Sequence, residues 1–259
     1  MNTETVLITG ASSGIGLELA KCFAAEECNL ILTARNREAL EKLADELCRK
    51  HDIKVEIVIA DLSLPESPQK IISQIKGRGI NVDVLVNNAG FGLHGAFTEL
   101  PLKRQLEIVQ VNIAALVELT GLFLPDMLRR NRGGILNVGS VAGFVPGPQM
   151  AVYYASKAFV LSFSESLHEE LRETKIQVTN LCPGPTESNF SSVARSHRAR
   201  EAQAKKMSAA EVARIGHRDF RAGVHISLPG AINKISAFAP RVFPRTVVRR
   251  LIGRYNKLK

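Results

Sequence analysis

The sequence predicts a single-domain α/β protein in which helices cover both faces of a doubly wound parallel sheet. Apolar runs of strand length alternate with amphipathic segments of helical periodicity, and a glycine-rich turn joins the first strand to the first helix. Polar or small residues follow the strands at their carboxyl ends, namely Gly10, Arg35, Asp61, Asn88, Ser140 and Pro183. Ligands of such sheets bind at that edge, so these residues mark the expected site.

The elements follow in order along the chain. Apolar runs predict strands at residues 6–8, 29–33, 55–60 and 82–86. Between them, apolar residues at three- and four-residue steps predict helices at 15–25, 37–49 and 67–76, as with Leu40, Leu43 and Leu47 on one face. The same patterns predict helices at 102–129 and 152–173, strands at 134–138 and 176–181, and a short last strand within 224–230. Such alternation implies parallel strands joined by right-handed crossovers.

The glycine-rich turn at residues 9–16, Thr-Gly-Ala-Ser-Ser-Gly-Ile-Gly, is the expected phosphate site. Glycine permits a positive φ and a close approach of a ligand to the backbone. The free N–H groups of a helix's first turn attract an anion. A plain surface turn could have the same composition, but the preceding strand and the following helix favour the binding of a dinucleotide. The turn residues expected to bind it are Gly10, Ser12, Ser13, Gly14, Ile15 and Gly16.

Composition fits one core in a cytoplasmic protein. The chain has 259 residues, 45% of them hydrophobic, and shows no linker or internal repeat, so we expect residues 1–259 to form one domain. The first strand begins too close to Met1 for a signal peptide, and the uncharged stretch 133–156 contains too much glycine and proline for a membrane helix. No metal-ligand spacing is present, so we expect no metal, and the cysteines are expected to be reduced core thiols: Cys22, Cys28, Cys48 and Cys182.

The net charge of +9 is unevenly distributed. No acidic residue follows Asp219, whereas the chain after it contains Arg221, Lys234, Arg241, Arg245, Arg249, Arg250, Arg254, Lys257 and Lys259. The preceding part is therefore neutral overall. This distribution indicates a basic tail on a neutral enzyme, and the tail lacks the interleaved aromatic residues of a nucleic-acid surface, so no nucleic-acid partner is expected.

Tyr153 and Lys157 are four residues apart on a predicted helix and share one face. A lysine ammonium near a phenol favours the phenolate and would lower the tyrosine pKa toward neutrality. A Tyr and a Lys at this spacing also occur by chance on helix surfaces. Ser140, at the end of a predicted strand, strengthens the catalytic interpretation because its hydroxyl could hydrogen-bond a carbonyl oxygen while Tyr153 donates a proton.

These motifs resemble the short-chain dehydrogenase/reductase family. The resemblance is carried, in order, by residues 9–16, Asn87 to Gly90, Asn112, Ser140, Tyr153-x-x-x-Lys157 and Pro183-Gly184-Pro185-Thr186, and covers about residues 5–190. It implies a Rossmann-like fold in which Tyr153 is the general acid/base. Lys157 would bind the nicotinamide ribose, and Ser140 would orient the substrate oxygen. Asn112 would hold a water in a proton relay. Tyr154, only three residues before Lys157, does not match the motif.

The resemblance also implies the remaining cofactor contacts. Asn88, Ala89 and Gly90 would shape the adenosine pocket, although they could form only a turn. Asp61 would hydrogen-bond the adenine with Leu62 beside it, although Asp61 could simply cap its strand. The other implied contacts are Pro183, Gly184 and Thr186, with Thr186 binding the nicotinamide amide.

The cofactor is expected to be NADP(H). Dinucleotide folds that prefer NAD place an acidic residue after the second strand, to bind the ribose 2′-hydroxyl. This chain has Thr33-Ala34-Arg35-Asn36 there. An arginine pairs well with a 2′-phosphate, although Arg35 could also be an ordinary exposed arginine.

The carboxyl-terminal third departs from the family pattern. Residues of about 186–223 correspond to a substrate lid and contain the basic residues Arg195, His197, Arg198, Arg200, Lys205 and Lys206. The acidic last turn typical of tetramers is missing, so a homodimer through the two long helices is expected, and a tetramer stays open. The basic amphipathic segment of about 240–259 contains a helix from Pro244 whose apolar face is expected to combine Val247, Val248, Leu251, Ile252, Tyr255 and Leu258. That face could bind an anionic membrane peripherally or pack on protein.

Together these features predict an NADPH-dependent carbonyl reductase or alcohol dehydrogenase acting on a small-molecule substrate, which could be apolar. The alternative is a cofactor-binding regulatory or scaffolding protein on the same fold. The presence of Ser140, Tyr153 and Lys157 together favours the enzymatic function over the regulatory or scaffolding one.

Overall fold

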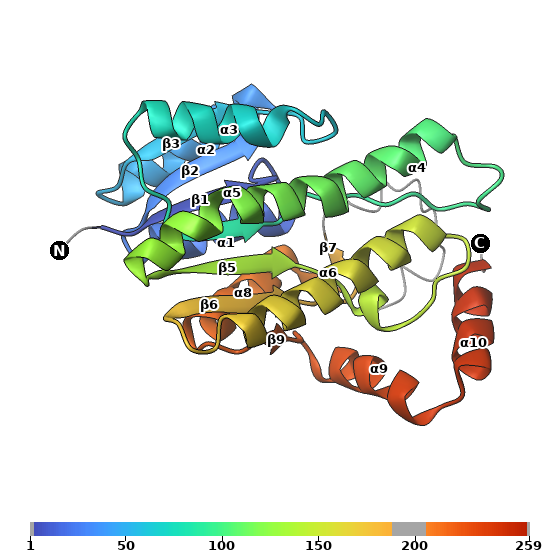
Figure 1. The fold of residues 1–259 in the computed structure, drawn as a ribbon. Helices are drawn as coiled ribbons and strands as arrows, with labels where there is room; N and C mark the ends of the chain where they lie inside the picture. The colour runs from blue at the N-terminus through green and yellow to red at the C-terminus, as the bar shows by residue number, and fades with distance from the viewer. Residues whose placement is uncertain (1–2, 188–205, 258–259) are drawn as a thin grey trace.

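A seven-stranded parallel sheet forms the centre of the molecule (Figure 1), in a computed structural model that describes residues 3–187 and 206–257. The strands have the order β3-β2-β1-β4-β5-β6-β9. Their bounds are β1 Thr5–Thr9, β2 Asn29–Ala34, β3 Val55–Ile59, β4 Val84–Asn87, β5 Gly133–Val138, β6 Ile176–Leu181 and β9 Ile226–Ser227. The strand order reverses between β1 and β4, which confirms the expected doubly wound sheet.

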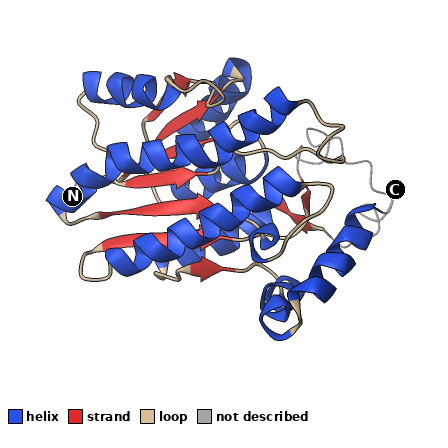
Figure 2. Cartoon of the chain, turned by 45° about the vertical axis from the view of Figure 1, so that its right-hand side comes forward, coloured by secondary structure: helices blue, strands red, loops and turns tan. Residues whose placement is uncertain are grey.

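Helices cover both faces of the sheet (Figure 2). Helices α1 (Gly14–Ala24), α2 (Arg37–Lys50) and α8 (Ala209–Arg221) pack on one face, and α3 (Ser67–Gly77), α5 (Ala115–Arg130) and α6 (Ala151–Glu170) pack on the other. Successive strand residues point to opposite faces, so Val6 and Ile8 lie in the first core layer and Leu7 in the second. All three are 0% exposed, and hydrophobic burial on both faces explains the continuous apolar runs.

The long helix expected at 102–129 is divided. Helix α4 (Leu102–Val109) is followed by a π-helical turn, Gln110–Ala114, and then by α5. Such a turn is often found at functional sites, and it turns Asn112 into the protein interior. Helix α6 also ends at Glu170, three residues before the expected end, because the chain turns at Leu171 to enter β6.

One helical run among the described residues, Leu102–Arg130, is long and apolar enough to span a membrane by length and composition alone. Its residues Leu119, Phe123 and Met127 are at most 4% exposed and belong to the core on the α3 side of the sheet. In this fold the run is therefore a core helix.

One expectation about the interior is corrected, and part of the expected lid region can be placed in the fold. Cys48 is exposed, so it is not a core thiol, whereas Cys28 and Cys182 are buried and all four cysteines are free. Part of the expected lid region is α8, whose Val212 and Phe220 are 1% exposed and pack in the core beside α1. Alternation of apolar and charged residues along α8 produces this buried face, so this part of the region is a wall of the core.

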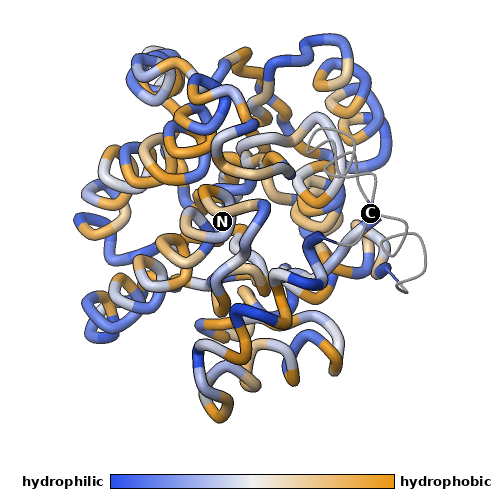
Figure 3. The backbone as a smooth tube through the Cα atoms, turned by 90° about the vertical axis from the view of Figure 1, so that its right-hand side faces the viewer, coloured by the Kyte–Doolittle hydropathy of each residue, from blue (hydrophilic) through white to orange (hydrophobic). Residues whose placement is uncertain are grey.

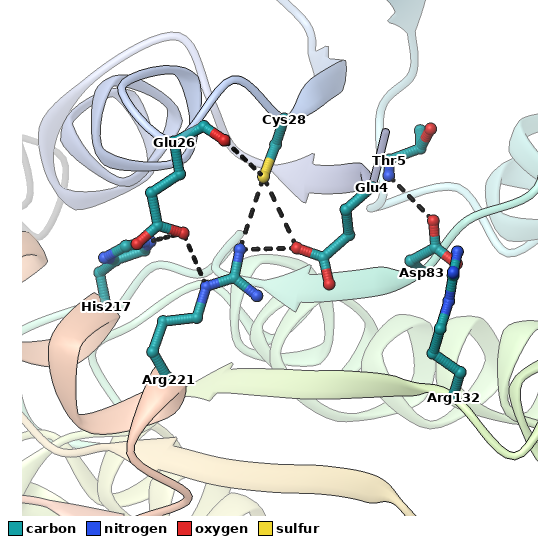
Figure 4. A network of polar contacts seen from close by, with 8 residues as sticks. All are labelled: Glu4, Thr5, Glu26, Cys28, Asp83, Arg132, His217 and Arg221. Carbon is teal, nitrogen blue, oxygen red and sulfur yellow. Dashed lines mark hydrogen bonds and ion pairs between the residues drawn. The ribbon is translucent and has the colours of Figure 1, made fainter. Parts of the chain in front are cut away.

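At the amino edge of the sheet, charged side chains join distant segments (Figure 4). Arg221, at the end of α8, donates to Glu4 at 2.6 Å and to Glu26 at 2.8 Å. Arg132 donates to Asp83 at 2.8 Å, and Asp83 accepts the Thr5 N–H at 3.0 Å. The network attaches α8 to the first strand and neutralises Arg221 with carboxylates from the first part of the chain.

Beyond β9 the chain forms two outlying helices, α9 (Ala231–Val242) and α10 (Arg245–Lys257). Figure 1 shows α9 at the lower edge and α10 rising from it toward the carboxyl side of the sheet. A separate pair of short strands, β7 (Thr186–Glu187) and β8 (Met207–Ser208), lies before α8. The helix expected from Pro244 is present, and the Pro244 carbonyl accepts the N–H of Val247 at 2.9 Å.

Candidate active site

The glycine-rich turn forms a cradle at the end of β1. Gly10 and Gly14 have φ of +65° and +57°, a conformation that side chains other than glycine rarely adopt. A Cβ on Gly16 would lie 2.3 Å from Asn88 Nδ2 and 2.5 Å from the Gly10 carbonyl oxygen. Ser13 is the N-cap of α1, but its side chain does not cap the helix, so the first-turn N–H groups are not bound by it. The turn therefore fits the diphosphate of a dinucleotide.

Asn88 braces this turn from the neighbouring strand. Its side-chain Nδ2 donates to the carbonyls of Thr9 at 2.8 Å and Gly10 at 3.2 Å. The Thr9 hydroxyl accepts the backbone N–H groups of Asn88 and Ala89, both at 2.9 Å. These bonds bring the predicted segments 9–16 and 88–90 together and fix the shape of the cradle.

Arg35 and Asp61 lie at the carboxyl ends of β2 and β3, which are adjacent in the sheet. Arg35 Nη1 is 3.9 Å from Asp61 Oδ2, and the arginine side chain is 71% exposed. Asp61 Oδ1 accepts the Ser63 N–H at 3.0 Å, so Asp61 does cap its strand while its other oxygen faces Arg35. Leu62 is 8% exposed and packs in the core on the α3 side.

Ser140 and Tyr153 meet beyond the end of β5. Ser140 is the N-cap of a short 3-10 helix, Val141–Phe144, and its hydroxyl accepts the Ala142 N–H at 3.1 Å. The same side chain is hydrogen-bonded to Tyr153 on the first turns of α6. Tyr153 is half-buried, and desolvation by the surrounding side chains raises its pKa to about 12, against the opposing effect of the Ser140 hydrogen bond. Tyr153 is therefore held in its acid form.

Lys157 lies one turn along α6 from Tyr153 and is 6% exposed. Its Nζ donates to the Val138 carbonyl at 2.7 Å, and a Cβ on Gly90 would be 3.5 Å from it. Burial lowers the pKa of Lys157 to about 8. The expected lowering of the Tyr153 pKa by Lys157 is absent in this arrangement, because the ammonium is directed to the end of β5 and burial dominates at the phenol.

Asn112 is 1% exposed and connects the π-helical turn to the site. Its Nδ2 donates to the Ser156 hydroxyl at 2.9 Å and to the Phe91 carbonyl at 3.0 Å, while its Oδ1 accepts the Phe91 N–H at 3.1 Å. Asn112 Oδ1 would also be 3.1 Å from a Cβ on Gly90, which places it beside Lys157. Asn112 is therefore a buried anchor of the loop after β4.

The turn after β6 completes the carboxyl edge. Pro183 accepts the Val141 N–H through its carbonyl at 3.0 Å, and the Thr186 hydroxyl donates to the Gly184 carbonyl at 2.9 Å. A Cβ on Gly184 would lie 2.2 Å from Asn233 Oδ1, so α9 packs directly against this turn. The predicted residues Pro183, Gly184 and Thr186 thus lie beside Ser140 at one edge of the sheet.

Sequence reasoning missed one junction next to the site, where three segments meet. The His94 Nε2 lies 2.8 Å from the Asn256 carbonyl oxygen, and Asn256 Nδ2 donates to the Pro148 carbonyl at 2.7 Å. The Gly95 N–H donates to Gln149, which has a positive φ of +69°. The loops after β4 and β5, which flank Ser140 and Tyr153, are thus attached to α10. The positive φ has no signal in the sequence, and neither does the 0% exposure of Asn256.

Tyr154 has a different environment from Tyr153. A Cβ on Gly147 would be only 2.2 Å from the Tyr154 ring, so this ring packs beneath the loop before α6. Most of the basic residues of the expected lid, Arg195, His197, Arg198, Arg200 and Lys205, lie outside the described residues.

The chain matches known proteins over most of its length. The sequence profile of the short chain dehydrogenase family matches residues 4–199. Sulfoacetaldehyde reductase 2 of Chromohalobacter salexigens is 37% identical over 193 residues, which are 74% of this chain and 76% of that protein.

Two solved structures are similar in both fold and sequence. A short-chain dehydrogenase from Sphingobium yanoikuyae in complex with NADPH is 30% identical, with a TM-score of 0.84 and 91% of each chain covered. A short chain dehydrogenase/reductase from Burkholderia phymatum in complex with NAD is 26% identical, with a TM-score of 0.82, covering 93% of this chain and 92% of that one. The first of these structures contains NADPH, and the second contains NAD.

Proposed function

The chain belongs to the short chain dehydrogenase family, whose members are oxidoreductases of alcohol and carbonyl groups, and we propose that it is an NADPH-dependent carbonyl reductase. The observation that carries this proposal is the hydrogen bond between Ser140 and Tyr153. It lies at the carboxyl edge of the sheet, beyond the strand-order reversal, where ligands of such folds bind.

The side chains divide the chemistry among them. The nicotinamide cofactor, when bound, supplies the hydride. Ser140 hydrogen-bonds the substrate oxygen and orients it toward the Tyr153 hydroxyl, which donates the proton that the reduced oxygen needs. A phenol with a pKa of about 12 is protonated at neutral pH, which suits the direction of carbonyl reduction. Lys157 binds the nicotinamide ribose, and Asn112 positions the loop after β4 and supports a water that connects Lys157 to solvent.

The remaining predicted residues hold the cofactor. The cradle at residues 9–16 receives the diphosphate on the first-turn N–H groups of α1, and its shape is fixed by the close packing of Gly10 and Gly16 against Asn88. Asn88, Ala89 and Gly90 form the adjacent wall, Asp61 receives the adenine, and Thr186 binds the nicotinamide amide.

Arg35 supports NADPH as the preferred cofactor. Its exposed guanidinium stands at the end of β2, where an acidic residue would bind the 2′-hydroxyl of NAD. The ion pair between Arg35 and Asp61 is long and solvent-exposed. Exchanging Asp61 for a 2′-phosphate as the partner of Arg35 would therefore cost little free energy.

The test is NADPH oxidation by the full chain across a panel of ketones, aldehydes and acyl-thioesters, with NADH in parallel. Turnover of at least one carbonyl class with NADPH is expected. Tight NADPH binding without turnover of any class would instead favour the cofactor-binding regulatory or scaffolding alternative.

A further inference from the structure

The outer side of α9 and α10 exposes large apolar side chains. On α9, Ile232, Ile235, Phe238 and Val242 are 78%, 69%, 60% and 66% exposed, and they recur at three- and four-residue steps along one face. Phe243, Val247 and Leu251 continue this exposure through the turn and along α10. We call these residues the C-terminal apolar surface. Figure 3 shows hydrophobic segments alternating with hydrophilic ones along these helices at the lower edge of the molecule.

The C-terminal apolar surface is not the face through which α10 packs on the rest of the protein. Helix α10 packs on the protein through a different face, on which Val248 is 8% exposed and Asn256 is fully buried. Ile252 and Tyr255 are partly buried on the same face. The single apolar face expected from the sequence is therefore divided, with Val247 and Leu251 turned outward. Clusters of exposed apolar residues of this kind mark interaction surfaces.

The charge around the surface has one sign. No acidic residue follows Asp219, and Arg221 is neutralised by Glu4 and Glu26. Six of the basic side chains on the two helices have no carboxylate within ion-pair distance among residues 3–187 and 206–257. These are Lys234, Arg245, Arg249, Arg250, Arg254 and Lys257.

A second group of exposed apolar residues, on α4, has a different character. Leu102 and Leu106 on α4 are 62% and 58% exposed, but charges of both signs accompany them, with Arg104 paired to Glu107. Mixed charge suits contact with a second copy of the chain. A two-fold contact through α9 and α10 would instead place like charges against like charges with no carboxylate between them.

We propose that the C-terminal apolar surface docks on an anionic lipid bilayer. Exposed aromatic and aliphatic side chains would enter the interface between headgroups and acyl chains, while the surrounding arginines and lysines bind the lipid phosphates. Because α10 also holds the loops that flank Ser140 and Tyr153, docking would place these loops near the membrane. The proposal does not depend on the proposed reductase activity.

The chain contains no tryptophan, which permits a specific test. Phe238→Trp places one fluorophore on the surface, and Leu64→Trp is the matched control, since Leu64 is 46% exposed and follows β3 at the opposite edge of the sheet from β9. Each variant is mixed with vesicles of phosphatidylglycerol and phosphatidylcholine, or of phosphatidylcholine alone. We expect a blue shift and quenching by brominated lipid for Phe238→Trp only, with anionic vesicles only, reversed by high salt. If Phe238→Trp does not fold, Phe243→Trp places the fluorophore on the same surface instead.

Charge variants complete the test by sedimentation of the full chain with the same vesicles. Arg249→Gln, Arg250→Gln and Arg254→Gln combined should weaken vesicle binding on the order of a hundredfold, at about fivefold per residue. The combination Arg37→Gln, Lys42→Gln and Arg49→Gln on α2 changes net charge equally and should leave binding unchanged. Absence of binding to anionic vesicles, or equal binding to neutral vesicles, would overturn the proposal. A blue shift that grows with protein concentration without lipid would assign the surface to a second copy.

Discussion

The side chains of Ser140 and Tyr153 are hydrogen-bonded to each other, although one follows β5 and the other begins α6. The contact exists because α6 packs against the 3-10 helix Val141–Phe144, whose N-cap is Ser140. Lys157 and Asn112 are fixed around it by buried hydrogen bonds to Val138 and Ser156. The pair is therefore held in place by the fold itself, as a site for a substrate oxygen requires.

Gly16→Ala should weaken both the fold and cofactor binding. The new Cβ would lie 2.3 Å from Asn88 Nδ2 and 2.5 Å from the Gly10 carbonyl, so the cradle must deform, at a cost of about 1–3 kcal/mol. Urea unfolding and NADPH fluorescence titration measure the two effects. Gly121→Ala is the control, because nothing lies within 4 Å of a Cβ on this exposed helical glycine, and it should stabilise by about 0.5–1 kcal/mol. Equal effects of the two substitutions would disprove the close approach.

Arg35→Asp should shift cofactor preference from NADPH toward NADH. The substitution replaces attraction of the 2′-phosphate by repulsion, so the ratio of kcat/KM for NADPH over NADH should fall by roughly 10- to 100-fold. Arg37→Asp, two residues along on α2, removes an exposed arginine paired with Glu41 and should leave the ratio almost unchanged. An unaltered ratio in the Arg35 variant would show that another group recognises the phosphate.

The buried ammonium of Lys157 should make stability depend on pH in a defined window. Desolvation lowers its folded-state pKa to about 8 from 10.5, so between these values the unfolded chain binds more protons at this residue than the folded chain. Its contribution to the free energy of unfolding therefore rises with pH from about 8 upward and is most unfavourable below pH 8. Consequently, the stability advantage of Lys157→Met over the wild type should shrink between pH 7 and pH 10. The measurement is urea unfolding across this pH range, with the exposed Lys175→Met as the control variant. A stability difference between Lys157→Met and the wild type that does not change with pH would contradict the lowered pKa.

Asn256→Ala should loosen the loops that flank the site. It removes the donor to the Pro148 carbonyl, which should lower the free energy of unfolding by about 1–3 kcal/mol. Because the affected loops surround the substrate position, KM for a carbonyl substrate should rise while the Kd for NADPH stays unchanged. Lys257→Ala, an exposed neighbour on α10, is the control. A parallel loss of NADPH affinity would assign Asn256 a general structural role instead.

The fold was predictable because its signals are local. The apolar runs that form β1 to β6 and the spacing of Leu40, Leu43 and Leu47 depend on periodicities of two and 3.6 residues, which survive in the sequence. The positions of Gly16 and Tyr153 at element junctions were visible for the same reason.

The rest depends on contacts between distant residues. His94 and Pro148 are 162 and 108 positions away from Asn256, and no periodicity reports such a meeting. The π-helical turn at Asn112 gives no sequence signal either, since its residues continue the helical pattern. The division of the apolar residues of α10 between two faces depends on which side packs against the Pro148 loop, which the helix alone does not determine. The raised pKa of Tyr153 likewise arises from burial by segments far apart in the chain.

The most direct test of the central claim compares Tyr153→Phe with Tyr154→Phe. Both lose one hydroxyl from adjacent positions of α6, but Tyr153 is hydrogen-bonded to Ser140, whereas the Tyr154 ring packs against Gly147. With the best carbonyl substrate of the panel, kcat for NADPH oxidation should fall by about 10²- to 10⁴-fold in Tyr153→Phe, with NADPH affinity nearly intact, and should change little in Tyr154→Phe. Near-normal turnover by Tyr153→Phe would contradict its assignment as the proton donor.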